Sequence, residues 1–407
     1  MMTNKNTPNW PSLQWVKCLL FLLFFPSLLF AQNSISGKVV RIDSKGPLSK
    51  VSIFLGNSSY GTITNDDGTF TLNNVKPGQY ELIATMVGFE DNIQTVLVSK
   101  DPVKLNIEMF PKITELHEVV VTDNANWKAN YAMFKPEFLG TSDNAKKCTI
   151  LNPHDISLVY KKSKRTLQAF SSEFIVIQNK ALGYNVKMLL KDFKYDEVNN
   201  VISWQGKLLF EELKGSASQQ AVWDKRRQEI YYGSPMHFFR SLRLGNLTDQ
   251  GFQVMILVRR PDPERPPQDV IVREYEHFKN SFLKDSINYW ARMYNRTKYI
   301  NQLIRTPVKE TQIMTDTSQP GIYGLEFPEC LYVMYTKKRE DVDFKDVYRP
   351  LDLPNYETSV VTLNGKYALF DMNGSVISSP SPLFEGTWSK DKVAELLPVD
   401  YLPPGAH

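Results

Sequence analysis

The chain has 407 residues, of which 42% are hydrophobic and 23% charged, and its formal net charge is +4. This composition is typical of a globular protein, and the length allows two or three domains. The charge excess is too small for the basic surface of a nucleic-acid-binding protein, so no nucleic acid partner is expected.

The first 31 residues are typical of a secretory signal peptide. Lys5 and Lys17 precede an apolar run from Cys18 to Ala31, which ends in a small residue and is followed by Gln32. The run contains a proline and is shorter than the roughly 20 apolar residues of a membrane-spanning helix. We expect cleavage between Ala31 and Gln32, export to the periplasm or outer membrane (or the cell surface), and no transmembrane segment in the mature chain. An uncleaved anchor is the alternative.

Apolar residues alternate with polar ones from Ile35 to about Pro111, which predicts half-buried strands. The apolar positions are Val51, Ile53, Leu55, Phe70, Leu72, Tyr80, Leu82, Ala84, Val103, Leu105, Ile107 and Met109. Turn sequences such as NDDG and KPGQ separate them, so a small antiparallel β-sandwich is predicted. The NDDG cluster lacks the oxygen spacing and distant glutamate of a calcium loop, and a turn with Gly68 at positive φ is expected instead.

This region resembles the carboxypeptidase-regulatory-like domain, a transthyretin-like sandwich of seven strands. The residues that carry the resemblance are Gly37, Pro47, Val51, Gly61, Thr62, Asp66, Gly68, Phe70, Pro77, Gly78, Tyr80, Gly88 and Phe89. The resemblance implies a sandwich over residues 32–112 that accompanies zinc carboxypeptidases but carries no catalytic group itself. It also implies a cell-envelope protein of the Bacteroidota, where such domains precede many TonB-dependent receptors.

Residues 113–145 are expected to form a linker and an aromatic segment. The stretch Glu118, Val119, Val120, Val121 and Thr122 resembles the segment that follows this domain in those receptors, where an extended strand is offered to a periplasmic partner. Two alternatives remain open, a partner-binding strand and an edge strand of the sandwich, and the edge strand is favoured. The following sequence lacks the repeated alternating segments of a receptor barrel.

An aromatic stripe follows, in which Trp127, Tyr131, Phe134 and Phe138 recur at three- and four-residue steps. This spacing predicts either an aromatic helical face or a segment that wraps against a core, and packing is favoured over a ligand platform.

Residues 146–407 are predicted to be an uncharacterised α+β domain, because strand-like and helix-like segments are segregated. Helices are expected around 218–232 and 236–244, with a break at Gly233 and Ser234. A long amphipathic helix is expected from Phe282 to Ile304 and a terminal helix over 389–398. The Pro-rich segment 259–269 is a candidate interaction loop, with a plain connector as the alternative. The sequences LNG and MNG predict hairpin turns. This region resembles uncharacterised envelope proteins of the same phylum, which brings no known activity.

Two cysteines, Cys148 and Cys330, remain after removal of the signal peptide. An oxidising compartment would allow them to form a disulfide, and two buried free thiols are equally compatible with the sequence.

No catalytic, cofactor-binding or metal-binding residue can be named from the sequence. None of the five histidines stands in a zinc-ligand motif, and no nucleophile elbow, phosphate-binding loop or dinucleotide fingerprint is present. We therefore predict a non-catalytic binding or scaffolding protein at the periplasmic face of the outer membrane, with an envelope protein or a glycan as its partner. The alternative is a hydrolase that acts on envelope or imported polysaccharide or peptide through unidentified carboxylates.

Overall fold

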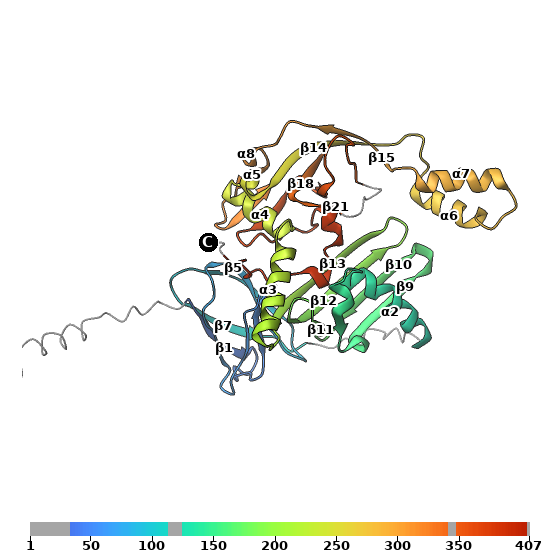
Figure 1. Cartoon of the computed structure of the whole chain (residues 1–407). Helices are drawn as coiled ribbons and strands as arrows, with labels where there is room; N and C mark the ends of the chain where they lie inside the picture. Colours follow the sequence, from blue (N-terminus) through green and yellow to red (C-terminus); the bar gives the residue numbers. More distant parts are fainter. Residues whose placement is uncertain (1–32, 113–123, 341–346, 405–407) are drawn as a thin grey trace, which may run out of the picture.

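The computed structural model describes residues 33–112, 124–340 and 347–404. Three β-rich parts pack around one centre, and a helical hairpin projects from the third part (Figure 1). The predicted cleavage site at Ala31 and Gln32 and the segment Glu118–Thr122 lie outside the described residues, so both remain predictions. No helix in the described part of the chain combines the length and apolarity needed to span a bilayer.

The first part is the predicted sandwich. One sheet has the order β4-β1-β7 and the other the order β3-β2-β5-β6. The strands are β1 (Ile35–Arg41), β2 (Ser52–Leu55), β3 (Gly61–Ile63), β4 (Thr69–Leu72), β5 (Gly78–Thr85), β6 (Asn92–Val98) and β7 (Val103–Met109). Most of the alternating apolar residues are buried between the sheets. The expectation of a purely antiparallel sandwich is wrong in one place, because β7 crosses from the other sheet and pairs with β1 in parallel.

The turn expected at NDDG is confirmed. Gly68 has a φ of 78°, which favours glycine because it carries no Cβ. The Gly68 amide donates to the Asn65 carbonyl at 2.9 Å, and Asp67 Oδ1 accepts the Thr69 amide at 3.0 Å. The acidic side chain therefore stabilises the turn itself.

The second part is a six-stranded sheet covered by a helix. Its strands are β8 (Cys148–Ile150), β9 (Ile156–Lys161), β10 (Thr166–Ser171), β11 (Ile175–Asn179), β12 (Tyr184–Asp196) and β13 (Val201–Glu212). Helix α2 (Asn124–Leu139) covers one face, and short 3-10 turns lie at Ala145–Lys147, Pro153–Asp155 and Lys162–Lys164. Phe134 and Phe138 are buried, and the Phe134 ring meets Phe193 edge-to-face at 4.9 Å. The aromatic packing helix is thus confirmed.

Three helices connect the second part to the third: α3 (Ala217–Tyr231), α4 (Pro235–Leu244) and α5 (Leu247–Gln250). Ser234 caps α4 by accepting the His237 amide at 3.2 Å, and Pro235 opens the helix, which has no need of its missing N–H there. Gly245 ends the helix at a φ of 66°. The predicted break at Gly233 and Ser234 is confirmed.

The third part contains a five-stranded sheet in the order β15-β14-β18-β19-β21 and a small sheet in the order β16-β17-β20. The strands are β14 (Phe252–Pro261), β15 (Tyr299–Ile304), β16 (Met314–Asp316), β17 (Ile322–Leu325), β18 (Cys330–Arg339), β19 (Tyr356–Thr362), β20 (Ala368–Asp371) and β21 (Leu383–Gly386). The helices are α6 (Gln268–Phe278), α7 (Lys284–Asn295) and α8 (Glu310–Ile313). Two hairpin turns were expected. At MNG the chain turns after β20 so that Val376 forms an antiparallel bridge with Phe370, whereas LNG joins β19 and β20, which belong to different sheets.

The expected helix from Phe282 to Ile304 is wrong in its second half. Helix α7 ends at Asn295, and Tyr299–Ile304 forms strand β15, which pairs antiparallel with β14. The segment is rich in β-branched and aromatic residues, which favour strands. Strand β14 pairs with it, and this pairing replaces the second half of the predicted helix. The Pro-rich loop is also shorter than expected, because β14 extends to Pro261 and α6 begins at Gln268.

The expected terminal helix over 389–398 is replaced by two 3-10 turns, Thr387–Lys390 and Val393–Glu395, and extended chain. We name residues 391–401 the C-terminal strap, because its backbone bonds to the sandwich, to the second part and to the connecting helix α4. Asn179 Nδ2 donates to the Ala394 carbonyl at 2.9 Å, and the Val399 amide donates to the Asn57 carbonyl at 2.8 Å. Arg240 Nη2 donates to the Val399 carbonyl at 2.7 Å. These long-range bonds satisfy the groups that a helix would have paired internally.

The sandwich packs directly on the second part. Phe54 and Ile83 of the sandwich form one buried cluster with Leu189 and Leu209 of β12 and β13. The backbone continues the contact, since the Asn57 amide donates to the Leu208 carbonyl at 2.7 Å. Part of the outer face of the sandwich is therefore covered by the same chain.

The two cysteines are free and buried in different hydrophobic clusters, so the disulfide left open by the sequence is absent from this structure. The Cys148 thiol lies 3.4 Å from the Asn144 carbonyl oxygen, and burial raises its pKa to about 12. The Cys330 thiol lies 3.4 Å from Thr362 Oγ1. Each sulfur packs in the core of a different sheet, which keeps the pair apart.

Candidate functional site: a central cleft

A cleft of about 2730 Å³ lies where the three parts meet. Its walls come from strands β5 and β6 of the sandwich, the β12–β13 hairpin, the base of the α6–α7 hairpin, and the chain from 371 to 399. Small-molecule pockets typically measure roughly 300–1,000 Å³. The cleft is therefore large enough for an extended polymer segment.

The floor of the cleft contains a buried ion pair between Arg259 of β14 and Glu385 of β21, whose side chains are 7% and 15% exposed. Arg259 Nε donates to Asn301 Oδ1 at 3.2 Å, and its guanidinium lies 5.0 Å from the centre of the Tyr299 ring. A buried charge pair with further polar partners fixes side-chain orientation. The pair thus holds Tyr299 and Asn301 on the cleft floor.

Ion pairs also neutralise several charged side chains of the other walls, whereas Lys194 and Lys298 form no ion pair with a residue that the structure describes. Lys191 pairs with Asp91 at 2.6 Å, and Lys207 pairs with Glu81, so both pairs join the sandwich to the β12–β13 hairpin. At the far end of that hairpin, Arg165 pairs with Glu197 at 2.5 Å.

Asp371 stands where the sandwich meets the third part. Its Oδ1 accepts the amides of Asn373 and Ser375, both at 2.9 Å, and Asn373 Nδ2 donates to the Gln79 carbonyl at 3.1 Å. Burial outweighs these bonds and raises the pKa of Asp371 to about 6. The carboxyl group therefore titrates close to neutral pH.

Asp391, at the start of the C-terminal strap, is the second carboxyl group with a raised pKa. Burial, together with the nearby carboxylates of Glu395 and Glu357, raises the pKa of Asp391 to about 8. Its side chain makes no hydrogen bond to any other residue that the structure describes. Lys392 lies between Asp391 and Glu137, and burial lowers the pKa of that ammonium group. Asp391 is thus a neutral acid at pH 7 in the cleft wall.

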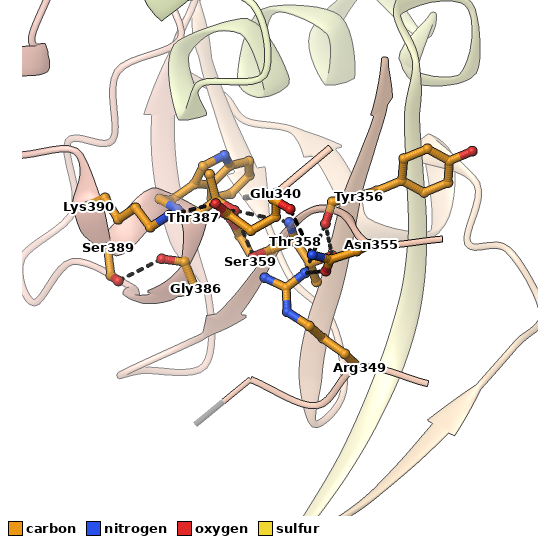
Figure 2. Close-up of polar contacts among 11 residues, drawn as sticks. Glu340, Arg349, Asn355, Tyr356, Thr358, Ser359, Gly386, Thr387, Ser389 and Lys390 are labelled. Carbon is orange, nitrogen blue, oxygen red and sulfur yellow. Dashed lines mark hydrogen bonds and ion pairs between the residues drawn. The ribbon is translucent and has the colours of Figure 1, made fainter. Parts of the chain in front are cut away.

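Figure 2 shows the polar network that supports this part of the wall. Glu340, at the start of the loop after β18, accepts Thr387 Oγ1 at 2.9 Å and Lys390 Nζ at 2.7 Å. Thr387 Oγ1 in turn accepts the Thr358 amide at 3.0 Å. The network fixes the turn from Gly386 to Lys390 against β19 and so positions Asp391, which follows it directly.

Further contacts of the same network indicate that it supports the wall and does not itself bind a ligand. Trp388 Nε1 donates to the Gly233 carbonyl at 2.7 Å, and the Trp388 amide donates to Ser359 Oγ at 3.1 Å. The Glu340 side chain is only 7% exposed. The polar groups of the network bond to one another, so the network supports the cleft wall.

No histidine lines the cleft in the described part of the chain. His237 is buried in the helical connection, where its Nδ1 accepts the Gly233 amide at 3.1 Å and its Nε2 bonds Gln250 Oε1 at 3.0 Å. Burial lowers the pKa of His237 to about 4, so it is neutral and both ring nitrogens are used. His154 stacks on Trp127 at 4.4 Å. Among residues 33–112, 124–340 and 347–404, no three His, Cys, Asp or Glu side chains gather as a metal site would require.

The sequence motifs predicted few of the residues that line the cleft. The Pro-rich segment contributes Arg259, Arg265 and Gln268 to the cleft, and Cys330 lies in its lining. Tyr299, Asp371 and Asp391 carried no motif and were missed. They come together only through strand pairing and the C-terminal strap.

The sandwich is the part of the chain that matches a known family. Residues 35–121 match the family model of the CarboxypepD_reg-like domain. The sequence resemblance over this part is thereby confirmed. The CarboxypepD_reg-like match extends past β7 into residues 113–121, which lie outside the described ranges, and it does not include the third part or most of the cleft. No match was found among curated proteins.

Several solved structures are similar to parts of the chain. The group B streptococcus pilus 2b backbone protein is 18% identical over 20% of this chain and 42% of its own, with a TM-score of 0.18. A type II cohesin-X-dockerin complex from Acetivibrio cellulolyticus is 14% identical over 19% of this chain and 58% of its own, with a TM-score of 0.18. A DUF3823 family protein from Bacteroides ovatus ATCC 8483 is 13% identical over 45% of this chain and 82% of its own, with a TM-score of 0.17. The chain thus spans less than two thirds of the first two, and similarity at this level carries no inference about function.

Proposed function

We propose that the protein binds an uncharged glycan chain non-catalytically in the cell envelope, and that the central cleft is the binding site. The observation that carries this proposal is the number of neutral amide and hydroxyl side chains in the cleft lining, where ion pairs neutralise many of the acids and bases beside them. A polyanion would need a cluster of unpaired cations, and a cationic ligand would need a cluster of unpaired acids.

Neutral hydrogen-bonding side chains are numerous in the lining. The amide side chains are Asn57, Gln79, Asn199, Asn200, Gln205, Gln268, Asn295, Asn301, Asn364 and Asn373. Several are exposed, and Asn364 uses its nitrogen for the Ser381 carbonyl at 2.7 Å, while its oxygen has no partner among the described residues. An amide both donates and accepts, as a sugar hydroxyl does, so the two groups are complementary.

Aromatic rings supply the second half of a sugar-binding surface. Tyr294 is 50% exposed and Tyr299 is 38% exposed, and both line the cleft. The Arg259 guanidinium lies over the Tyr299 ring, 5.0 Å from its centre, and this contact keeps the ring in place without a ligand. The apolar face of such a ring can pack against the C–H face of a sugar.

Titration calorimetry with neutral hexasaccharides of glucose, xylose and mannose tests the proposal. We expect at least one of them to bind more tightly than a hexagalacturonate of the same length. Tyr299→Ala should weaken binding roughly tenfold, as expected for loss of a central aromatic contact, whereas Tyr299→Phe should keep it. Tyr367→Ala is the matched control, because Tyr367 is 56% exposed and lies outside the cleft lining. Absence of binding by every neutral glycan, or equal loss in both alanine variants, would refute the proposal.

The envelope location rests on the signal-peptide pattern of residues 1–31 and on the CarboxypepD_reg-like match. We propose a periplasmic or outer-membrane-associated protein. N-terminal sequencing of the native protein tests this, with Gln32 as the expected first residue and Met1 or Met2 as the contradicting result.

One observation favours a second candidate function, hydrolysis of a glycan or peptide. Burial raises the pKa of Asp391 to about 8 and that of Asp371 to about 6, and two carboxyl groups with separated pKa values in one cleft are typical of an acid and a base in hydrolysis. Incubation with the same hexasaccharides and measurement of released reducing ends tests this function. Turnover that is lost in Asp391→Asn would make the protein an enzyme.

A further inference from the structure

The α6–α7 hairpin stands out from the body of the protein (Figure 1). Helices α6 (Gln268–Phe278) and α7 (Lys284–Asn295) pack against each other and project away from the sheet of the third part (Figure 1). We name residues 279–284 the hairpin tip. None of the tip residues lines the cleft, so the tip is a separate surface.

The base of the hairpin is fixed to the body by charge-assisted hydrogen bonds. Arg296 bonds Asp262 at 2.5 and 3.0 Å and Glu264 at 2.7 Å, and Arg265 Nε donates to the Arg296 carbonyl at 2.9 Å. Along the hairpin, the rings of Tyr275 and Tyr294 stack at 4.8 Å. The hairpin is thus a stiff arm, and its tip has a defined place relative to the sheets.

The tip presents two adjacent large apolar side chains to solvent. Phe282 is 101% exposed and Leu283 is 61% exposed. The backbone that carries them is ordered by local bonds, since the Ser281 amide donates to the Phe278 carbonyl at 2.8 Å and Ser281 Oγ accepts the Leu283 amide at 2.9 Å. The two side chains are adjacent on an ordered loop, so together they leave a continuous apolar surface in water, which a partner surface would cover.

Basic side chains flank these two residues. Lys279 and Lys284 are exposed on either side, and Lys284 forms no ion pair with any residue in the described part of the chain. Glu276 neutralises Lys279 through an ion pair, and Asp285 lies in the first turn of α7. The Lys284 ammonium group can therefore reach an anionic headgroup through its flexible stem, whereas Lys279 would first have to leave Glu276.

We propose that the hairpin tip inserts Phe282 and Leu283 into the headgroup region of a lipid bilayer. Stable protein–protein interfaces bury at least about 1,000 Å² with good complementarity, which two adjacent side chains on a narrow convex tip cannot supply. A bilayer surface accepts apolar side chains to a depth of about 5–10 Å and needs no shaped pocket. Insertion of the tip would anchor the arm while the cleft remains accessible to its ligand.

Flotation of the full mature chain with vesicles of phosphatidylethanolamine and phosphatidylglycerol tests the proposal. We expect the wild-type protein to float with these vesicles and the Phe282→Ser/Leu283→Ser variant to partition about 10- to 100-fold less. Leu351→Ser is the matched control, because Leu351 is 105% exposed elsewhere on the surface and should leave partitioning unchanged. Thermal melting of each variant confirms that the fold is retained.

A second double variant tests the role of the headgroups. Lys279→Gln/Lys284→Gln should bind less to anionic vesicles and lose the salt dependence of binding. Two results would overturn the proposal: no flotation of the wild type, or equal flotation of wild type and the Phe282→Ser/Leu283→Ser variant. Sedimentation that shows self-association abolished by this variant, without vesicle binding, would assign the tip to a second copy instead.

Discussion

Replacing Arg240 should release the C-terminal strap from helix α4. Arg240 is only 9% exposed, and its guanidinium donates to three backbone carbonyls. Nε bonds Asn373 at 2.8 Å, Nη1 bonds Tyr401 at 2.9 Å and Nη2 bonds Val399 at 2.7 Å. Arg240→Ala would leave three carbonyls without this donor, at the point where the strap meets the sandwich and the cleft wall.

The magnitude follows from these three bonds. A hydrogen bond from a charged donor contributes roughly 1.5–3 kcal/mol, and bonds that share one side chain are not additive. Partial rehydration of the strap reduces the loss further. We therefore expect Arg240→Ala to lower the free energy of unfolding by about 3–5 kcal/mol.

Urea denaturation followed by circular dichroism measures this change, with limited proteolysis to detect release of the strap. Arg243→Ala is the control on the same helix, because Arg243 Nε is buried without a hydrogen-bond partner among the described residues. We expect the control to change stability by less than about 1 kcal/mol. Equal effects of the two substitutions, or an Arg240→Ala loss below about 1 kcal/mol, would refute the reasoning.

Three further predictions follow from the structure and the sequence. The pKa of Asp391 is raised from 3.8 to about 8, so the folded chain keeps a proton that the unfolded chain has lost between these pH values, and the stability contribution of the group falls as pH rises from 4 to 8. Asp391→Asn should flatten this decline in urea titrations by on the order of 1–3 kcal/mol, whereas identical pH profiles would contradict the buried acid. Cys148 and Cys330 should both react with iodoacetamide in unfolded, unreduced protein, and protection of the pair would indicate a disulfide. Val120→Pro should lower the melting temperature if Glu118–Thr122 is an edge strand, while wild-type melting with lost capture of a partner would favour the partner-binding strand.

The features that sequence predicted well are those with local causes. Alternation of apolar residues placed the sandwich strands, since a half-buried strand needs only its own pattern. Gly68 at its turn and Ser234 at the start of α4 were equally local, because turn and cap geometry depends on a few adjacent residues. The aromatic face of α2 followed from its helical spacing.

The features that sequence missed have distant causes. Tyr299 belongs to a segment with helical spacing, and its strand forms because β14 lies beside it. Arg259 and Glu385, 126 residues apart, meet only when β14 and β21 enter the same sheet. The prediction of a terminal helix was wrong for the same reason, because Asn179 and Arg240 bond to the backbone of the strap. No local sequence pattern predicts partners that lie this far away in the chain.

Hydrogen–deuterium exchange of the full chain, with and without a saturating neutral hexasaccharide, tests the proposed role of the cleft most directly. The account predicts slower exchange in β13, in β15 and in the chain from 371 to 385, which line the cleft from three sides. Exchange at the hairpin tip should stay the same. Protection confined to the outer strands of the sandwich, or no protection by any hexasaccharide that binds, would contradict a glycan-binding cleft.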